Sequence, residues 1–485
     1  MEVKDLKPSL VWECFDEITK VPRPSCHEEQ IRAYLLDFAK KHNIDVRTDK
    51  VGNVVMTKPA TKGHENAPTV ILQAHMDMVA EKNNDVQHDF LKDPIDTYID
   101  GDWVKARGTT LGADNGIGMA AAMAVLIDKD LTHGPVECLF TINEEIGLEG
   151  AQNLGEGMIS GSMLINLDSE DDGEIFVGCA GGIDTTAIFN YRKSLAPENF
   201  SYMRVSVSGL LGGHSGSDIN LGRGNANKLV ARFIWECSRK WPVEVCSFDG
   251  GNLRNAIPRE AFAVFGVQAQ HKEDLCRSLK HYAEEIRNEY KGVEPSMEFS
   301  IEDVERPEYS IDSETSEALV RAIYSAPHGV YSMSRDIIGL VETSTNLAAV
   351  KMIDDDKIKI TTSQRSSVES RKNDIAGQVE AHFLLAGAEV SHSDGYPGWA
   401  PNMESTIMKL SADAYEELFG VKPAIKAIHA GLECGLFLAK YPNLDMVSFG
   451  PTMTGVHSPD EKLNIPTVEK FWKHLCKVLE KVAAL

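Results

Sequence analysis

Short apolar runs alternate with segments of helical periodicity in the first third of the chain. Three runs have the length and continuity of buried strands: residues 67–80, 136–143 and 163–168. Residues 10–43 have the spacing of amphipathic helices, interrupted by two prolines, and an Ala- and Met-rich helical segment covers 116–128. This alternation of strand and helix predicts an α/β sheet.

The pattern changes after a glycine-rich turn that ends near residue 183. Alternating apolar and polar residues, as at 200–207, predict half-buried strands, and long amphipathic helices are predicted at 225–240 and 272–291. This middle part therefore has the character of an α+β domain, although residues 293–316 give no clear assignment. The final part of the chain returns to helix, strand and helix.

Ionisable side chains follow the apolar runs of the first part. Singly, each has an ordinary explanation as a loop histidine, a turn or a solvated acidic pair. Because the carboxyl ends of parallel strands meet at one edge of a sheet, their joint occurrence predicts a single site. Two His, two Asp and one Glu can hold two divalent cations if one carboxylate bridges them, as in two-metal hydrolases. The candidate ligands are His75, Asp114, Glu145, Asp168 and His457.

Eight motifs along the chain carry a family resemblance. They are His75-Met-Asp77, Gly112-Ala-Asp114-Asn-Gly, Asn143-Glu-Glu-Ile-Gly, Asn166-Leu-Asp168, Gly212-Gly-His214-Ser-Gly, Arg254-Asn255-Ala-Ile-Pro, His429-Ala-Gly431-Leu-Glu-Cys-Gly and Gly455-Val-His457-Ser-Pro. With them the chain resembles the co-catalytic zinc peptidases that include carnosinases, peptidase T, carboxypeptidase G and the acylases. Within that family it is most similar to the bacterial aminoacyl-histidine dipeptidases (peptidase D). The resemblance covers essentially the whole chain.

Ligand chemistry and the resemblance give the same distribution of metal ligands. Asp114 is the natural bridging carboxylate, because its two oxygens can be shared between the cations. His75 and Asp168 would complete one metal site, and Glu145 and His457 the other. Nitrogen and oxygen ligands of this kind favour Zn²⁺, with Co²⁺ or Mn²⁺ as substitutes. The resemblance also implies a cis peptide after Asp114.

Two further acidic residues are expected to serve catalysis. Asp77 stands two residues after His75 and would orient its ring. Glu144 is surplus to the coordination count, so it is free to take a proton from a metal-bound water. The activated water would attack the peptide carbonyl, and Glu144 would pass the proton to the leaving nitrogen.

The ligand positions predict the domain organisation. His457 must lie with residues 75–168 to complete the site, so the chain between them contains an insertion. The expected division is a mixed-sheet catalytic domain formed by 1–187 and 395–485, with an inserted α+β lid at 188–394. The resemblance implies the same two-domain α/β fold.

The lid is expected to supply most of the substrate contacts. By resemblance, His214 would donate a hydrogen bond to the developing oxyanion. Asn255 and Arg365 would hold the terminal carboxylate of the substrate, a task that suits the bidentate guanidinium. Gly431 would add a backbone contact from the catalytic side.

Composition excludes several classes of partner. The 485 residues carry a net charge of −24, which argues against a nucleic-acid partner because such binding needs basic surface. No apolar run reaches the length of a membrane span. The nine cysteines form no Cys-x-x-Cys pair and are typical of a reducing compartment. We therefore expect a cytoplasmic enzyme without membrane or nucleic-acid partners, and the resemblance implies a homodimer.

The expected activity is hydrolysis of small Xaa-His dipeptides, including β-alanyl-histidine, and the preference for histidine follows from the resemblance alone. A tripeptidase, an N-acyl amino acid hydrolase or a carboxypeptidase stays open as an alternative. A non-catalytic metal-dependent binding protein is also open, but it would have no need of Asp77, Glu144 or His214.

Overall fold

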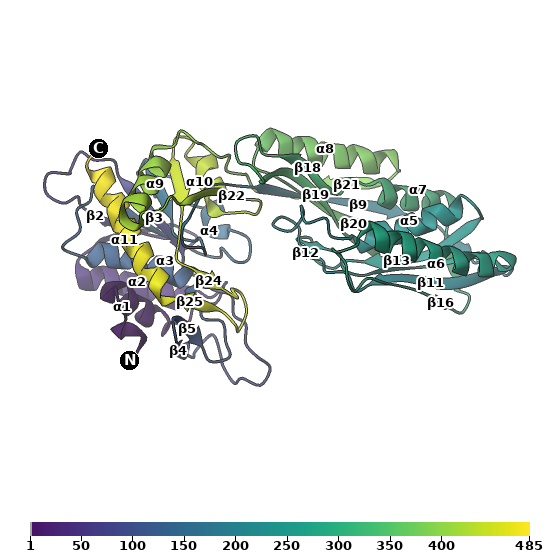
Figure 1. The fold of residues 1–485 in the computed structure, drawn as a ribbon, viewed down its shortest axis with the longest axis horizontal. Helices are drawn as coiled ribbons and strands as arrows, with labels where there is room; N and C mark the ends of the chain where they lie inside the picture. The colour runs from purple at the N-terminus through teal and green to yellow at the C-terminus, as the bar shows by residue number, and fades with distance from the viewer. Residues whose placement is uncertain (1) are drawn as a thin grey trace. The chain divides into compact units, whose positions relative to one another are not determined.

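The computed structural model describes residues 2–485 and divides into two compact units (Figure 1). The first unit comprises the chain up to Cys179, Trp399–Ala427 and Leu432–Leu485. The second comprises Ala180–Gly398 and the short segment Ile428–Gly431. Within residues 2–485, none of the helices combines the length and the apolar content that a bilayer crossing requires.

The first unit is built on an eight-stranded mixed sheet with the strand order β1-β2-β6-β3-β7-β23-β8-β22. Its central strands β6, β3, β7 and β23 run parallel to one another. The strand bounds are β1 Asp45–Thr48, β2 Val54–Lys58, β3 Val70–His75, β6 Val136–Thr141, β7 Met163–Asn166, β8 Glu174–Cys179, β22 Ala424–Ile428 and β23 Asp445–Ser448. Every residue of β3, β6 and β7 is buried, as expected of parallel strands covered on both faces.

Helices surround this sheet. The Ala- and Met-rich helix α3 is buried along nearly its whole length and packs against β3 and α1. The bounds are α1 Ser9–Ile18, α2 Glu29–His42, α3 Ala113–Ile127, α4 Glu149–Gln152, α9 Thr406–Phe419, α10 Glu433–Lys440 and α11 Ile465–Ala483, with the short 3₁₀ helix η1 Val3–Asp5. A separate four-stranded sheet contains β4 Thr97–Asp100, β5 Trp103–Ala106, β24 Met453–Thr454 and β25 Lys462–Asn464.

The second unit is a nine-stranded antiparallel sheet with helices. The main strand order is β16-β11-β15-β13-β19-β20-β9-β21, with β18 paired to β19. The strands are β9 Gly181–Asn190, β11 Phe200–Ser208, β13 Val243–Gly250, β15 Ala261–Gln268, β16 Glu298–Asp303, β18 Gly329–Met333, β19 Val341–Ile353, β20 Lys357–Ser366 and β21 Glu389–His392. Two small pairs are formed by β10 Lys193–Leu195 with β17 Tyr309–Ile311, and by β12 Gly213–His214 with β14 Ala256–Ile257.

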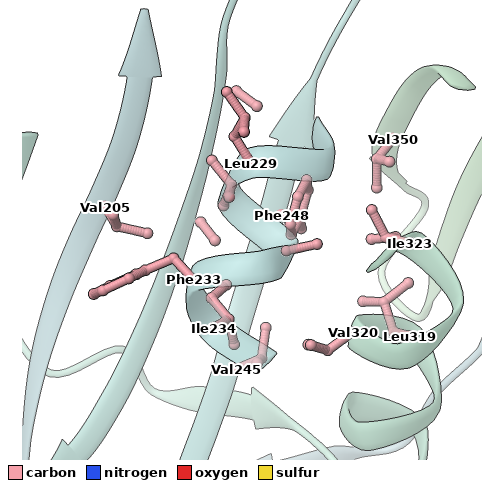
Figure 2. Close-up of a cluster of buried hydrophobic side chains, with 14 of the residues drawn as sticks. Val205, Leu229, Phe233, Ile234, Val245, Phe248, Leu319, Val320, Ile323 and Val350 are labelled. Carbon is pink, nitrogen blue, oxygen red and sulfur yellow. The ribbon is translucent and has the colours of Figure 1, made fainter. Parts of the chain in front are cut away.

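One apolar core joins the helices and the sheet of the second unit. Leu229 and Phe233 of α5 point at the sheet, and Leu319 and Ile323 of α7 pack beside them (Figure 2). The helices are α5 Ala226–Ser238, α6 Lys272–Glu289, α7 Ser313–Ser325 and α8 Glu369–Leu385, with the 3₁₀ helix η2 Ala269–His271. The α/β fold class with an inserted α+β part, as predicted, is confirmed.

The register of the parallel strands determines where functional side chains can gather. His75 pairs with Thr141, and Gln73 pairs with Asn166. The loops that follow β3, β6 and β7 therefore leave the sheet at the same edge. This edge is where ligands bind in open parallel sheets.

Buried His474 of α11 makes the stability of the first unit depend on pH. Burial lowers its pKa to about 4, although the Ser411 carbonyl and Asp172 oppose the shift. The unfolded state, with a pKa near 6.5, therefore binds a proton before the folded state does. The free energy of unfolding therefore contains a contribution from neutral His474 that is present above pH 6.5. About 3 kcal/mol of it is lost as the pH falls towards 4.

We expect His474→Gln to flatten this dependence in urea unfolding followed between pH 7 and 4, because the titrating group is gone. His281→Gln, at a side chain that is 74% exposed, is the control and should keep the wild-type slope. Equal slopes for wild type and His474→Gln would contradict the assignment.

Candidate metal centre and substrate-binding residues

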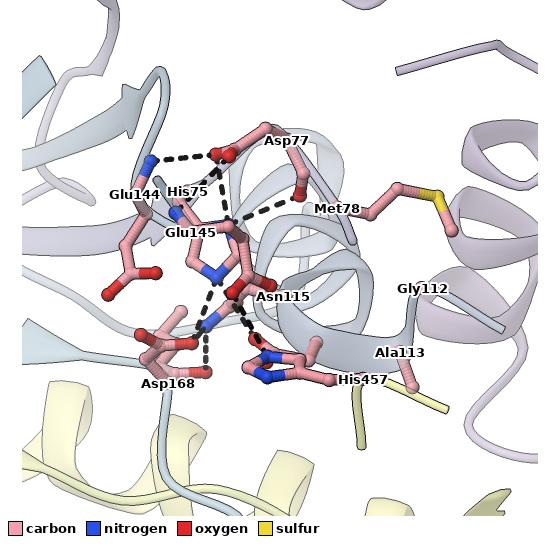
Figure 3. A network of polar contacts seen from close by, with 12 residues as sticks. His75, Asp77, Met78, Gly112, Ala113, Asn115, Glu144, Glu145, Asp168 and His457 are labelled. Carbon is pink, nitrogen blue, oxygen red and sulfur yellow. Dashed lines mark hydrogen bonds and ion pairs between the residues drawn. The ribbon is translucent and has the colours of Figure 1, made fainter. Parts of the chain in front are cut away.

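Five chain segments bring acidic and imidazole side chains together at the carboxyl edge of the first unit's sheet (Figure 3). His75 is the last residue of β3, and Asp114 is the second residue of α3. The Glu144–Glu145 pair follows β6, Asp168 follows β7, and His457 lies in the loop after β24. Donor atoms of His75, Asp114 and Asp168 lie within 4.8 Å of one another, as do those of Asp114, Glu145 and His457.

Asp114 lies between the two histidines. Its Oδ1 is 2.9 Å from Nε2 of His75, and its Oδ2 is 3.1 Å from Nε2 of His457. The two donor groups thus share one residue, and each uses a different oxygen of it. The Asp114–Asn115 peptide is cis, as the family resemblance implied.

Asp77 ties the His75 segment to the loop of the glutamates. Its Oδ1 lies 3.3 Å from Nδ1 of His75, which leaves Nε2 directed at Asp114 and Asp168. The backbone N–H groups of Glu144 and Glu145 donate to the same carboxylate, at 3.0 and 3.3 Å. The hydroxyl of Ser25 adds a hydrogen bond of 2.8 Å. Asp77 therefore orients the ring and holds the neighbouring loop.

The donor set fits a divalent cation. Glu145 directs Oε2 to Nε2 of His457 at 2.9 Å, whereas its Oε1 is buried and has no hydrogen-bond partner among residues 2–485. Such an atom is costly unless something satisfies it. Carboxylate oxygens with imidazole nitrogens suit Zn²⁺ and other borderline cations.

The electrostatics of the cluster favour positive charge. Hydrogen bonds that the His457 ring donates to the carboxylates of Asp114 and Glu145 raise the pKa of His457 to about 11. Burial lowers the pKa of His75, but Asp168 and Asp114 more than offset it, so the net shift is strongly upward. Carboxylates that stabilise a protonated imidazole stabilise a metal cation for the same reason.

Glu144 lies beside this cluster. Burial raises the pKa of its carboxyl well above the usual value, and the carboxylates of Asp168, Glu433 and Glu145 add to the shift, against His75. One carboxylate oxygen of Glu144 lies within 4.8 Å of donor atoms of His75 and Glu145. The Glu144 carboxylate thus lies close to the candidate metal ligands, where a general base would have to act.

The second unit contains the other predicted site residues. His214 of β12 accepts backbone N–H groups of Gly216 and Ser217 at Nδ1, at 3.2 and 3.1 Å. Burial and the positive charge of Arg365 lower the pKa of His214, so the ring is neutral at neutral pH. With Nδ1 accepting, the single ring proton stays on Nε2, which makes His214 a neutral donor.

Arg365 is the centre of a small cluster in the same unit. It is buried, and its guanidinium donates to the hydroxyls of Tyr396 at 2.8 Å and Ser215 at 3.4 Å. A Cβ added at Gly431 would lie 2.8 Å from the Tyr396 ring, so that ring packs directly on Gly431. The side chain of Asn255 is exposed, and the backbone carbonyl of Asn255 accepts the N–H of Ser215 at 2.8 Å. Arg365, Gly431 and Asn255 therefore belong to one neighbourhood.

Sequence reasoning missed several residues that contact these groups. Tyr396 holds Arg365, and Ser25 holds Asp77. Arg23 and Glu461 contact the backbone of the segments that carry Asp77 and Asp114. A charged residue between two prolines, as in Pro-Arg23-Pro, was a possible signal, and Glu461 stands four residues after His457.

Comparisons with known proteins identify the family of the chain. Residues 71–481 match the model of peptidase family M20/M25/M40. The chain is 45% identical to the cytosol non-specific dipeptidase of Escherichia coli (strain K12) over 100% of this chain and 99% of that protein. The crystal structure of aminoacylhistidine dipeptidase from Vibrio alginolyticus superposes with a TM-score of 0.92 at 44% identity, over 99% and 98% of the two chains.

The aminopeptidase PepT of Bacillus cereus shares the fold, with a TM-score of 0.58 at 17% identity over 99% of each chain. The motifs found in the sequence, the arrangement of their side chains and the full-length likeness lead to the same assignment. The chain is a hydrolase of peptidase family M20/M25/M40, which confirms the resemblance that its motifs indicated.

Proposed function

We propose that this protein is a dipeptidase that uses two divalent cations, most simply Zn²⁺, bridged by Asp114. The observation that carries the proposal is the position of the Asp114 carboxylate, which directs one oxygen to each of two histidines. His75 and Asp168 would hold one cation, and Glu145 and His457 the other. When bound, the pair would polarise the peptide carbonyl and lower the pKa of a coordinated water.

The protein's own side chains carry the protons and the orientation. Glu144 takes a proton from the attacking water at a carboxylate oxygen and returns it to the leaving nitrogen, a role worth about 10²–10⁴-fold in rate. Asp77 keeps the proton of His75 on Nδ1, so that Nε2 is free as a ligand. His214 donates its Nε2–H to the oxyanion, a contact that strengthens as charge develops on that oxygen.

The proposed substrates are dipeptides with free termini. Arg365 and Asn255 would bind the terminal carboxylate, and Gly431 would contact the substrate backbone. The relatives support this class, since one is named a non-specific dipeptidase and the other an aminoacylhistidine dipeptidase. We propose that Xaa-His dipeptides, including β-alanyl-histidine, are among the substrates, and that the enzyme is cytoplasmic and homodimeric.

Substitution of Glu144 should impair turnover, whereas substitution of Asp114 should impair metal binding. Glu144→Gln should keep both metal ions, because it is not a ligand, and lose at least about 10²-fold in kcat. Asp114→Ala should lose metal, since the bridge serves both sites. Metal analysis after gel filtration, with turnover measured on the same samples, separates the two roles. Metal loss in Glu144→Gln would show that the glutamate pair is assigned in the wrong order.

Removal of His214 should affect the chemical step more than substrate binding. We expect His214→Ala to lower kcat by about 10²–10³-fold, as for loss of one oxyanion donor, with a much smaller change in KM. Steady-state kinetics on a single Xaa-His dipeptide give both constants, and His271→Ala is the control from the same unit. A kcat near the wild-type value would show that His214 does not bind the oxyanion and is an ordinary loop residue.

The termini of the substrate should decide whether it is cleaved. A hydrolysis panel with added Zn²⁺ should show turnover of Xaa-His and other free dipeptides, and poor turnover of tripeptides, N-acetyl forms and C-terminal amides. Arg365→Met should reduce the difference in cleavage rate between free dipeptides and their C-terminal amides, because the charge that distinguishes them is gone. Arg306→Met removes an exposed cation of the same unit and should leave that difference unchanged. Equal cleavage of free and amidated dipeptides by the wild type would refute the dipeptidase proposal.

A further inference from the structure

Two buried charges in the first unit have no part in the donor set. Arg23 and Glu461 are each 2% exposed. Burial lowers the pKa of the Arg23 guanidinium, and Glu461 and then Asp77 are the carboxylates that most oppose this. A buried charge is tolerated only where hydrogen bonds and opposite charge compensate its lost hydration. The partners of these two residues therefore indicate what they are for.

Glu461 accepts hydrogen bonds from four successive backbone N–H groups. Its Oε2 accepts from Leu111 at 2.7 Å and Gly112 at 3.0 Å. Its Oε1 accepts from Ala113 at 2.8 Å and Asp114 at 3.3 Å. The carboxylate thus binds the start of α3, where the N–H groups have no partner within the helix. The last of the four belongs to the bridging residue itself.

Arg23 binds the carbonyl oxygens of this segment and of the segment that follows β3. Its Nη2 donates to Gly112, and its Nη1 donates to Asp77 at 2.8 Å and Met76 at 3.2 Å. One guanidinium therefore joins the segment after β3 to the segment before Asp114. Gly112 has a φ of +68°, and a Cβ there would lie 2.6 Å from Nη2 of Arg23. The close approach requires glycine at this position.

The two contacts together leave the Asp114 backbone little freedom. Asp114 and Asn115 have non-helical backbone angles inside α3, so the helix ladder does not hold this residue in place. The carboxylate must nevertheless present one oxygen to His75 and the other to His457. Side chains that orient metal ligands are typically worth 10–100-fold in metal affinity.

We propose that Arg23 and Glu461 are positioning residues that clamp segment 111–114 and so direct the Asp114 carboxylate at both cations. The proposal rests on the proposed bridging role of Asp114. This positioning role differs from a general contribution to folding, because loss of the clamp should weaken metal binding at both sites even where the protein stays folded.

Glu137 provides a matched control in the same unit. It is also a buried carboxylate that accepts backbone N–H groups, from Ser160 at 2.8 Å and Gly161 at 3.0 Å, and it pairs with Arg47. Glu137 lies at the amino end of β6, opposite the strand ends from which the ligand loops leave the sheet. Glu137→Gln should therefore reproduce the loss of a buried carboxylate without touching the metal centre.

The experiment titrates metal-free protein with Zn²⁺ in competition with a chromophoric chelator and measures the thermal unfolding of the same metal-free samples. Glu461→Gln places an amide donor against backbone N–H groups, and Arg23→Lys keeps the charge but loses the planar fork. We expect both variants to weaken the Kd of both ions by about 10–100-fold. Glu137→Gln should lose thermal stability and keep both Kd values within about twofold of wild type.

The outcomes separate the two proposals. Wild type that binds fewer than two ions would overturn the dinuclear centre. If wild type binds two ions, but Glu461→Gln or Arg23→Lys has the same Kd values as Glu137→Gln, the clamp alone would be overturned. If Glu461→Gln does not fold, Arg23→Lys decides the result by the same comparison.

Discussion

The site depends on one geometric constraint, which is that a single carboxylate must face two imidazoles. Asp114 meets it with distances of 2.9 and 3.1 Å to histidines that are 382 positions apart in the chain, at residues 75 and 457. The parallel register of β3, β6 and β7 brings the loops that follow these strands to one edge. The negative charge gathered there raises the pKa of both imidazoles, and the same field would hold metal cations.

Loops cannot use a sheet ladder to hold their shape, so buried side chains do it here. Asp77 accepts two backbone N–H groups of the glutamate loop, and Glu461 accepts four from the segment that carries Asp114. Arg23 joins the two segments through their carbonyls. Backbone groups compensate much of each of these buried charges, and their hydrogen bonds restrain the irregular backbone of the segments that carry the candidate ligands.

The parts that could be predicted from sequence are those with a local pattern. Apolar runs ending in His75 or Asp168 indicated strands and their functional edge, and the family and fold class inferred from the motifs are confirmed. The contacts of Arg23 and Tyr396 could not be predicted, because their partners are distant in sequence. The partners of Arg23 are backbone carbonyls, which residue type does not reveal. The strands β16 and β17 were not predicted, because β16 has three acidic residues and no buried position and β17 is only three residues long.

Diffraction data collected on both sides of the zinc absorption edge, from crystals of the zinc-loaded protein, would show how many ions bind and which residues hold them. We expect two anomalous peaks, one on either side of the Asp114 carboxylate. The first should lie beside His75 and Asp168, and the second beside Glu145 and His457. A single peak, or two peaks that do not share Asp114, would contradict the bridged centre on which the proposed chemistry depends.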